Sequence, residues 1–467
     1  MWNVFEVFIV TCIAAGLLFV RNPSAGKMLS ASRWMLMSWS ILLAVRFFSP
    51  IRFLVMPVTW RTWLYGGIWV GTFVLADNVR FLLFSRARSA RRPRGGNFYS
   101  RRSMQVYAAL AVAGALMLIY THRQAASSAK SESVMSQLRD TQLEGDGAGI
   151  LITVATVLAC CGLIVALVET CRAVREQRAI PLRAWFSLAA YLAVTILTGG
   201  RPGFVLGTLS LCIAAIASIQ MSGLGFARFR KTLLAGCAIA LASAGYIVFV
   251  VSTRTVGFAG DMDTKIALVN SLLGSSLDPR FRDSVRPYGV VGDTVIEAFY
   301  YLGPQFEGLD YALQHYEGPH GGGLTEFPYI TRRIENLSGM KILDPINDAY
   351  NRMFEKIGIF PHFFATAAQN TSLDFGPFLS IPFVFLCGAL SQRSRRRALD
   401  HREPLQIAMQ ALICTGAAWT IIFSPLDEQS WSFPLIWVIV IPIIGEAASS
   451  VRFTAVRRIG WSEKTNA

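Results

Sequence analysis

Long apolar runs separated by polar or basic connections dominate the sequence. A membrane-spanning helix needs about 20 mainly apolar residues. Runs of this kind predict spans at about 3–20, 34–56, 62–84, 104–120, 149–170, 184–198, 203–221, 232–252, 375–391, 405–423 and 431–449. Arg46, Pro50 and Arg52 interrupt the second run, which makes it a candidate for a broken helix. The pattern predicts an all-α polytopic membrane protein with about 11 transmembrane helices.

One connection, residues 253–362, is much longer than the others. It holds 14 acidic and 10 basic residues and is rich in Gly, Pro, Tyr and Phe. Its aromatic content favours an ordered cap on the membrane face, with helices expected at 264–274, 292–316 and 346–357. The expected organisation is helices 1–8 in 1–252, the cap in 253–362, helices 9–11 in 363–449 and a basic tail in 450–467.

Composition and charge narrow the class of protein. Only 16% of the residues are charged, whereas soluble proteins have about 25%. Much of the formal charge of +15 comes from alternate connections, such as 86–102 and 393–397. The positive-inside rule places these connections in the cytoplasm, so the N-terminus is expected outside and the C-terminus inside. The excess charge then reflects orientation and contact with anionic lipids, and no nucleic-acid partner is expected.

The eight cysteines are scattered, and nearly all lie inside apolar runs. The sequence has no CxxC motif and no cluster of His and Cys residues. We therefore expect neither a disulfide framework nor a metal site.

Two arginines at the outer ends of apolar hairpins are candidate ligands for an anion. Arg201 lies in the stretch TGGRPGF, residues 198–204, and Arg254 follows the eighth expected span. A guanidinium group near the membrane is costly unless it pairs or faces an aqueous cavity. It matches a phosphate group in bidentate fashion. Interfacial snorkelling or pairing with a carboxylate is the structural alternative.

The cap offers three candidates for a general base. His320 precedes three consecutive glycines, which allow either close approach to a ligand or a flexible turn. Asp293 and Glu297 share one face if their segment is helical, and either carboxylate could take a proton from a hydroxyl group. A solvent-exposed histidine and a solvated acidic face are the alternatives.

A polar stretch, QNTSLDFG at 369–376, leads into the ninth expected span. Asp374 is expected to cap the start of that helix, with binding of a polar ligand or of Arg201 or Arg254 as alternatives. Asn370 is a candidate for lining a cavity.

Short motifs follow one another in order between residues 184 and 391. They are TGGR at 198–201, FYYLGP at 299–304, Gly323, Thr325 and Phe327 with Arg332 after them, DFG at 374–376 and CGAL at 387–390. With a large outer loop before the last three spans, this order resembles Wzy-type polymerases of O-antigen and exopolysaccharide repeat units. Glu326, inserted between Thr325 and Phe327, departs from the family pattern.

The resemblance implies a GT-C-like glycosyltransferase of the bacterial inner membrane, with its cap in the periplasm. Such enzymes transfer a growing chain from undecaprenyl pyrophosphate to the next lipid-linked oligosaccharide unit. The implied reaction inverts the anomeric carbon and needs no metal or other cofactor. A Wzz-type chain-length regulator is a further partner implied by the family.

The resemblance also implies roles for the candidate residues. The expected pyrophosphate ligands are Arg201, Arg254 and Arg332. The expected general base is His320 or Glu297, with Asp293 next, while Asn370 and Asp374 would line the cavity. An O-antigen ligase acting on lipid A-core is the nearest alternative, and a polysaccharide or lipid transporter or flippase is a second one.

Overall fold

In the computed structural model we describe residues 24–53, 58–79, 101–128, 147–197, 202–223, 245, 262–358, 366–422 and 424–438. This part of the chain is mainly helical. One group of helices is α2 (Ala25–Met28), α3 (Ala31–Phe48), α4 (Trp60–Asn78), α6 (Arg101–Ser128), α8 (Gly147–Arg175), α9 (Leu182–Leu197), α10 (Pro202–Ser222), α18 (Ala367–His401) and α19 (Pro404–Trp419). Residues 429–438 are also helical.

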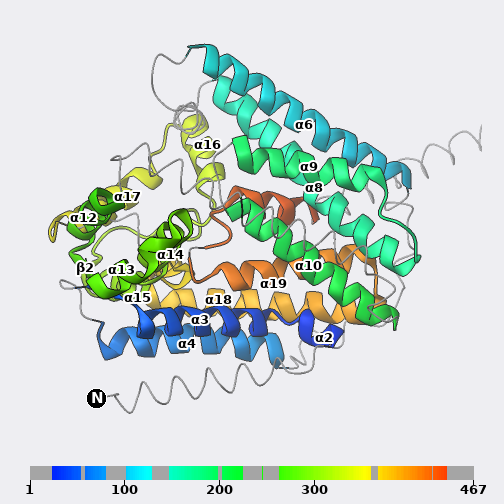
Figure 1. Ribbon diagram of the computed structural model, residues 1–467. Coiled ribbons are helices and arrows are strands. Elements are labelled where there is room, and N and C mark those ends of the chain that lie inside the picture. The colour runs from blue at the N-terminus through cyan, green and yellow to red at the C-terminus, as the bar shows by residue number, and fades with distance from the viewer. Residues whose placement is uncertain are drawn as a thin grey trace, which may run out of the picture.

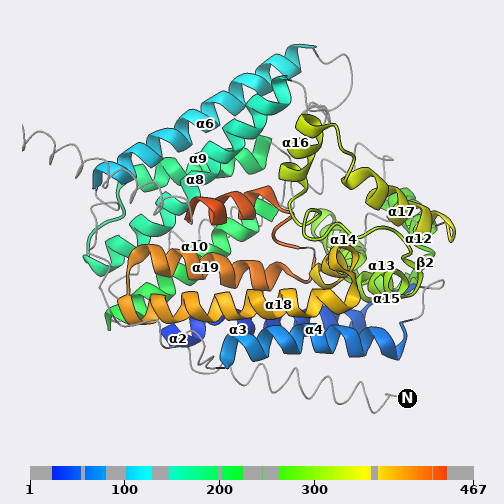
Figure 2. The same ribbon diagram turned by 180° about the vertical axis from the view of Figure 1, so that it is seen from behind.

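A second group of helices lies at one end of the first (Figures 1 and 2). It contains α12 (Met262–Leu273), α13 (Pro279–Val285), the short 3-10 helix η3 (Arg286–Tyr288), α14 (Val290–Leu302), α15 (Gln305–His315), α16 (Pro328–Ser338) and α17 (Leu343–Glu355). We call the first group the bundle and the second the cap. Each has its own buried apolar core, with Trp39 and Leu163 in the bundle and Ile296 and Phe354 in the cap.

Four helices of the described residues are long and apolar enough to cross a membrane. They are Ser103–Arg123, Leu151–Arg175, Pro202–Ser222 and Ala367–His401, and α9 is a shorter apolar helix. This agrees with the expectation of a helical membrane protein. The expected span 3–20, most of 232–252 and the second half of 431–449 lie outside the described residues.

The second expected span, 34–56, is not one helix. α3 ends at Phe48, and β1 (Ile51–Phe53) pairs antiparallel with β2 (Ser275–Leu277) of the cap. A proline disfavours the helical conformation of the preceding residue, so Pro50 explains why the helix ends here. The part of the chain that the structure describes is therefore mainly helical, as expected, with one two-stranded sheet that ties the end of α3 to the cap.

The expected cap helix at 292–316 is two helices, α14 and α15, which meet at Gly303 and Pro304. The other two expected cap helices correspond to α12 and α17. α13 and α16 were not expected. α16 begins with Pro328, which suits a first helical turn because its missing N–H would have no partner there.

Candidate functional site

Helix α18 is broken near the cap. Gly376 has φ 75° and ψ 158°, outside the helical range, and Pro377 follows it. Glycine adopts positive φ without steric cost, and proline disfavours a helical residue before it. The break leaves a segment of α18 before Gly376 on the cap side and a long segment after it in the bundle (Figure 1).

The predicted role of Asp374 as the cap of this helix is wrong. α18 begins at Ala367, earlier than the expected start at 375, and the Thr366 side chain accepts a hydrogen bond from Gln369 N at 3.1 Å. Thr366 thus provides the N-cap, because its oxygen satisfies one of the free N–H groups of the first turn. Asp374 instead lies two residues before the break and is fully buried.

His320 lies over the break in α18. Its Nδ1 is 2.7 Å from the carbonyl oxygen of Leu373, which can only accept a hydrogen bond. Nδ1 therefore carries a proton in this contact, and in the neutral imidazole the lone pair is then on Nε2. A Cβ added to Gly376 would lie 3.4 Å from Nε2, so glycine gives the ring close access to the backbone at the break. The His320 side chain is exposed, so a ligand could reach Nε2.

The glycine run approaches α18 itself. A Cβ on Gly321 would lie 2.3 Å from Asp374 Oδ1, so any larger residue at 321 would collide with the carboxylate. Gly322 N donates to the Asp374 carbonyl oxygen at 2.9 Å, and Thr325 N lies 3.4 Å from Asp374 Oδ1. These contacts hold the loop that carries His320 against the broken helix. The run thus forms an ordered turn on Asp374, where a flexible turn had been one expectation.

Glu326 is the second buried carboxyl group of this loop. It is 2% exposed, and its Oε2 accepts a hydrogen bond from the Ser424 hydroxyl. Burial raises the pKa of Glu326 to about 8, with a smaller contribution from the negative charge of Asp374, and the Ser424 hydrogen bond only partly offsets this. Glu326 Oε1 and Asp374 Oδ2 have no hydrogen-bond partner within the described residues. We call His320, Glu326 and Asp374 the cap–helix site.

Stability should depend on the protonation of Glu326. Its folded pKa of about 8 lies above the value of about 4.3 for an unfolded glutamate. A raised folded pKa contributes stability that is complete below the unfolded pKa and is lost as the pH rises through the folded one. Between pH 5 and pH 9 we expect a loss on the order of 3 kcal/mol in the wild-type protein and much less in Glu326→Gln. Thermal unfolding in detergent at both pH values measures this.

Glu317→Gln is the matched control for this prediction, because Glu317 is exposed and lies in the same loop. It should keep the wild-type pH dependence. An unchanged pH dependence in Glu326→Gln would show that Glu326 is already ionised in the folded protein.

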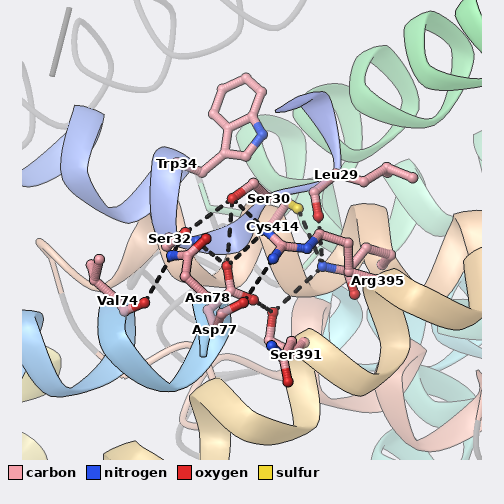
Figure 3. Close-up of polar contacts among 12 residues, drawn as sticks. Leu29, Ser30, Ser32, Trp34, Val74, Asp77, Asn78, Ser391, Arg395 and Cys414 are labelled. Carbon is pink, nitrogen blue, oxygen red and sulfur yellow. Dashed lines mark hydrogen bonds and ion pairs between the residues drawn. The ribbon is translucent and has the colours of Figure 1, made fainter. Parts of the chain in front are cut away.

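A different polar cluster lies at the far end of α4 and α18 (Figure 3). Buried Asp77 accepts hydrogen bonds from Ser391 Oγ at 2.8 Å and Ser32 N at 3.1 Å. Arg395 donates to the Asp77 carbonyl at 2.7 Å and to Ser30 Oγ at 2.7 Å, and it pairs with Asp77 Oδ2 at 3.2 Å. Arg395 was expected to contact lipid, but here it binds α3 and α4. Because these donors match the buried carboxylate of Asp77, we interpret this cluster as structural.

The remaining predicted site residues lie elsewhere or outside the described residues. Arg332 pairs with Asp344 at 2.5 Å and with Glu335 at 3.0 Å, which joins α16 to α17. Asp293 and Glu297 lie on α14 and take no part in the contacts that define the cap–helix site. Asn370 is half-buried in the first turn of α18.

Arg201 and Arg254 lie outside the described residues. Among the described residues, no group of three or more His, Cys, Asp or Glu side chains could hold a metal ion.

The sequence pointed to Glu326 only as an insertion and did not predict its burial. Its signal was weak, because an acidic residue in a glycine-rich loop is usually exposed.

Comparison with known proteins identifies no relative of this chain. No family model matches the chain, and neither the curated proteins nor the solved structures contain a significant match. The class that the fold defines is therefore a mainly helical protein with four candidate membrane-spanning helices among its described residues.

Proposed function

We propose that the protein is a glycosyltransferase that polymerises lipid-linked oligosaccharide repeat units. The order of its motifs resembles that of Wzy-type polymerases, and the main support from the site is His320. This histidine is exposed, its Nδ1 proton is held by the Leu373 carbonyl, and its free Nε2 lies over the break in α18. A positioned imidazole with an accessible lone pair is suited to general-base catalysis.

In the proposed reaction, His320 Nε2 takes the proton from the acceptor hydroxyl of the incoming unit. The acceptor oxygen forms a bond to the anomeric carbon of the growing chain while the bond from that carbon to the pyrophosphate oxygen breaks. Direct displacement inverts the anomeric carbon, and undecaprenyl pyrophosphate leaves. Arg201 and Arg254 are the proposed ligands of the departing pyrophosphate, because guanidinium groups stabilise developing phosphate charge.

Asp374 and Glu326 both have positioning roles in the proposed mechanism. Asp374 is fully buried and holds the glycine run after His320 through Gly322 N, so its proposed role is to fix that run against α18. Glu326 is too buried to reach a substrate and is a positioning residue for the loop that carries His320. Arg332 pairs with Asp344 and Glu335, so its proposed role is to hold α16 against α17, and it ranks below Arg201 and Arg254 as a pyrophosphate ligand.

The proposed location is the bacterial inner membrane, with about 11 spans and the cap in the periplasm. The N-terminus would then be periplasmic and the C-terminus cytoplasmic. The apolar helices Leu151–Arg175 and Ala367–His401 support a membrane location.

Removal of the protein from its cell distinguishes the proposed function from its two alternatives. A polymerase-deficient cell should make lipid capped with a single repeat unit and no polymer ladder. Carrier-linked polymer that is not transferred would indicate a ligase, and the absence of both ladder and single-unit caps would indicate a transporter. Electrophoresis of the surface glycolipids and of the carrier-linked glycolipids measures all three outcomes, and complementation with the intact chain is the control.

A further inference from the structure

Three arginines converge on one buried glutamate where α8 turns into α9. Glu169 is fully buried, and its Oε1 lies 2.7 Å from Arg172 Nη1 and 3.0 Å from Arg183 Nη2. Arg178 Nη2 lies 3.2 Å from Glu169 Oε2. This turn lies at the end of the bundle away from the cap (Figures 1 and 2).

The backbone of the turn places Arg178 in this group. Gln177 has φ 52°, the left-handed conformation in which a helix end usually has glycine. Gln177 N bonds to the Val174 carbonyl at 3.2 Å, and Arg178 N bonds to the Ala173 carbonyl at 2.9 Å, the pattern of a Schellman motif. A non-glycine residue in this conformation is strained, and such strain clusters at functional sites.

Positive charge exceeds negative charge in the turn. Besides Glu169, Glu176 is the second acidic residue of the segment 169–183, and it pairs with Arg178 Nε at 2.5 Å. The same segment has four arginines, the fourth being Arg175, so two positive charges are unmatched. The Arg183 side chain is only 20% exposed, and its Nε is buried without a hydrogen-bond partner in the part of the chain that the structure describes. Partly desolvated cations in excess favour the binding of an anion.

Exposed apolar side chains lie beside these cations. Leu182 is 73% exposed, Phe186 63% and Trp185 37%, all within the first turns of α9. Cations next to exposed aromatic and aliphatic residues at a helix end match a ligand that has both an anionic group and an apolar body. A soluble anion would make no use of the apolar face.

We propose that Arg178 and Arg183 bind the phosphate of an anionic phospholipid whose acyl chains lie along Leu182 and Phe186. The proposed membrane orientation would place this lipid in the cytoplasmic leaflet. The site is remote from His320 and does not depend on the glycosyltransferase reaction.

Thermal unfolding of the detergent-purified protein tests the site. Added phosphatidylglycerol should raise the melting temperature by about 3 °C or more, whereas phosphatidylcholine and inorganic phosphate should leave it nearly unchanged. Native mass spectrometry should retain phosphatidylglycerol on the wild-type protein.

The test variant is the triple substitution Glu169→Gln, Arg178→Gln and Arg183→Gln, which removes the two proposed phosphate ligands without leaving a buried carboxylate unpaired. It should lose the phosphatidylglycerol shift and the retained lipid. Arg280→Gln is the matched control, with the same change in net charge at an exposed position in the cap, and should keep both. Equal shifts in the triple variant and the control would overturn the proposal. A shift of the same size with inorganic phosphate would also overturn it, in favour of a soluble anion.

Discussion

Replacement of His320 by alanine is expected to slow polymer formation by about 10²–10⁴-fold, the usual contribution of a general base. The substitution removes Nε2, which lies over the break in α18, and also the Nδ1 hydrogen bond to Leu373. The His320 side chain is exposed, so the melting temperature should fall only slightly. The measurement is the rate at which purified protein converts undecaprenyl-pyrophosphate-linked repeat units into polymer.

His401→Ala is the control for this prediction. His401 is exposed at the opposite end of the same helix, α18. This variant should polymerise at the wild-type rate. A wild-type rate in His320→Ala would remove His320 from the mechanism and leave Glu297 and Asp293 as the candidates for the base.

Replacement of Arg395 by alanine is expected to lower the free energy of unfolding by about 3–5 kcal/mol, the cost of breaking a buried ion pair from one side. The substitution would leave Asp77, which is 0% exposed, without its cationic partner and remove a hydrogen bond to Ser30. These contacts join α18 to α4 and to the start of α3 (Figure 3), so all three helices should loosen together. Thermal or chemical unfolding in detergent measures the effect.

Two further variants distinguish the loss of the Asp77–Arg395 ion pair from a general effect of net charge on stability. Arg397→Ala, at an exposed position two residues away, should change stability by less than about 0.5 kcal/mol. The double variant Asp77→Leu with Arg395→Met should recover much of the loss, because it leaves no unpaired buried charge. If Arg395→Ala and Arg397→Ala are equally stable, the Asp77 pair does not hold the bundle together.

Much of the helical organisation could be predicted from hydropathy, because a run of apolar residues in the bilayer can satisfy its backbone hydrogen bonds only as a helix. α8 and α10 fall within a few residues of the expected spans. The interruption at Pro50 correctly indicated that the helix ends nearby, since α3 ends at Phe48. The partner of β1 could not be foreseen, because β2 is more than 200 residues away in the sequence and carries no pairing signal of its own.

The site was predicted less well than the helices. His320 and Asp374 were singled out separately, but the contacts that bring their segments together depend on a loop that folds back from the cap onto α18. The sequence DFGP did contain the signal for the break, since glycine followed by proline disfavours a continuous helix. The burial of Glu326 depends on Ser424, almost 100 residues later, and no local pattern predicts such a contact.

The most direct test of the proposed function is an assay of the purified wild-type protein with one defined undecaprenyl-pyrophosphate-linked repeat unit and no other enzyme. We predict a ladder of products that grow by one unit at a time, release of undecaprenyl pyrophosphate, and loss of the ladder in His320→Ala but not in His401→Ala. Full recovery of the unreacted unit from folded wild-type protein would contradict the proposal that this chain is the polymerising enzyme.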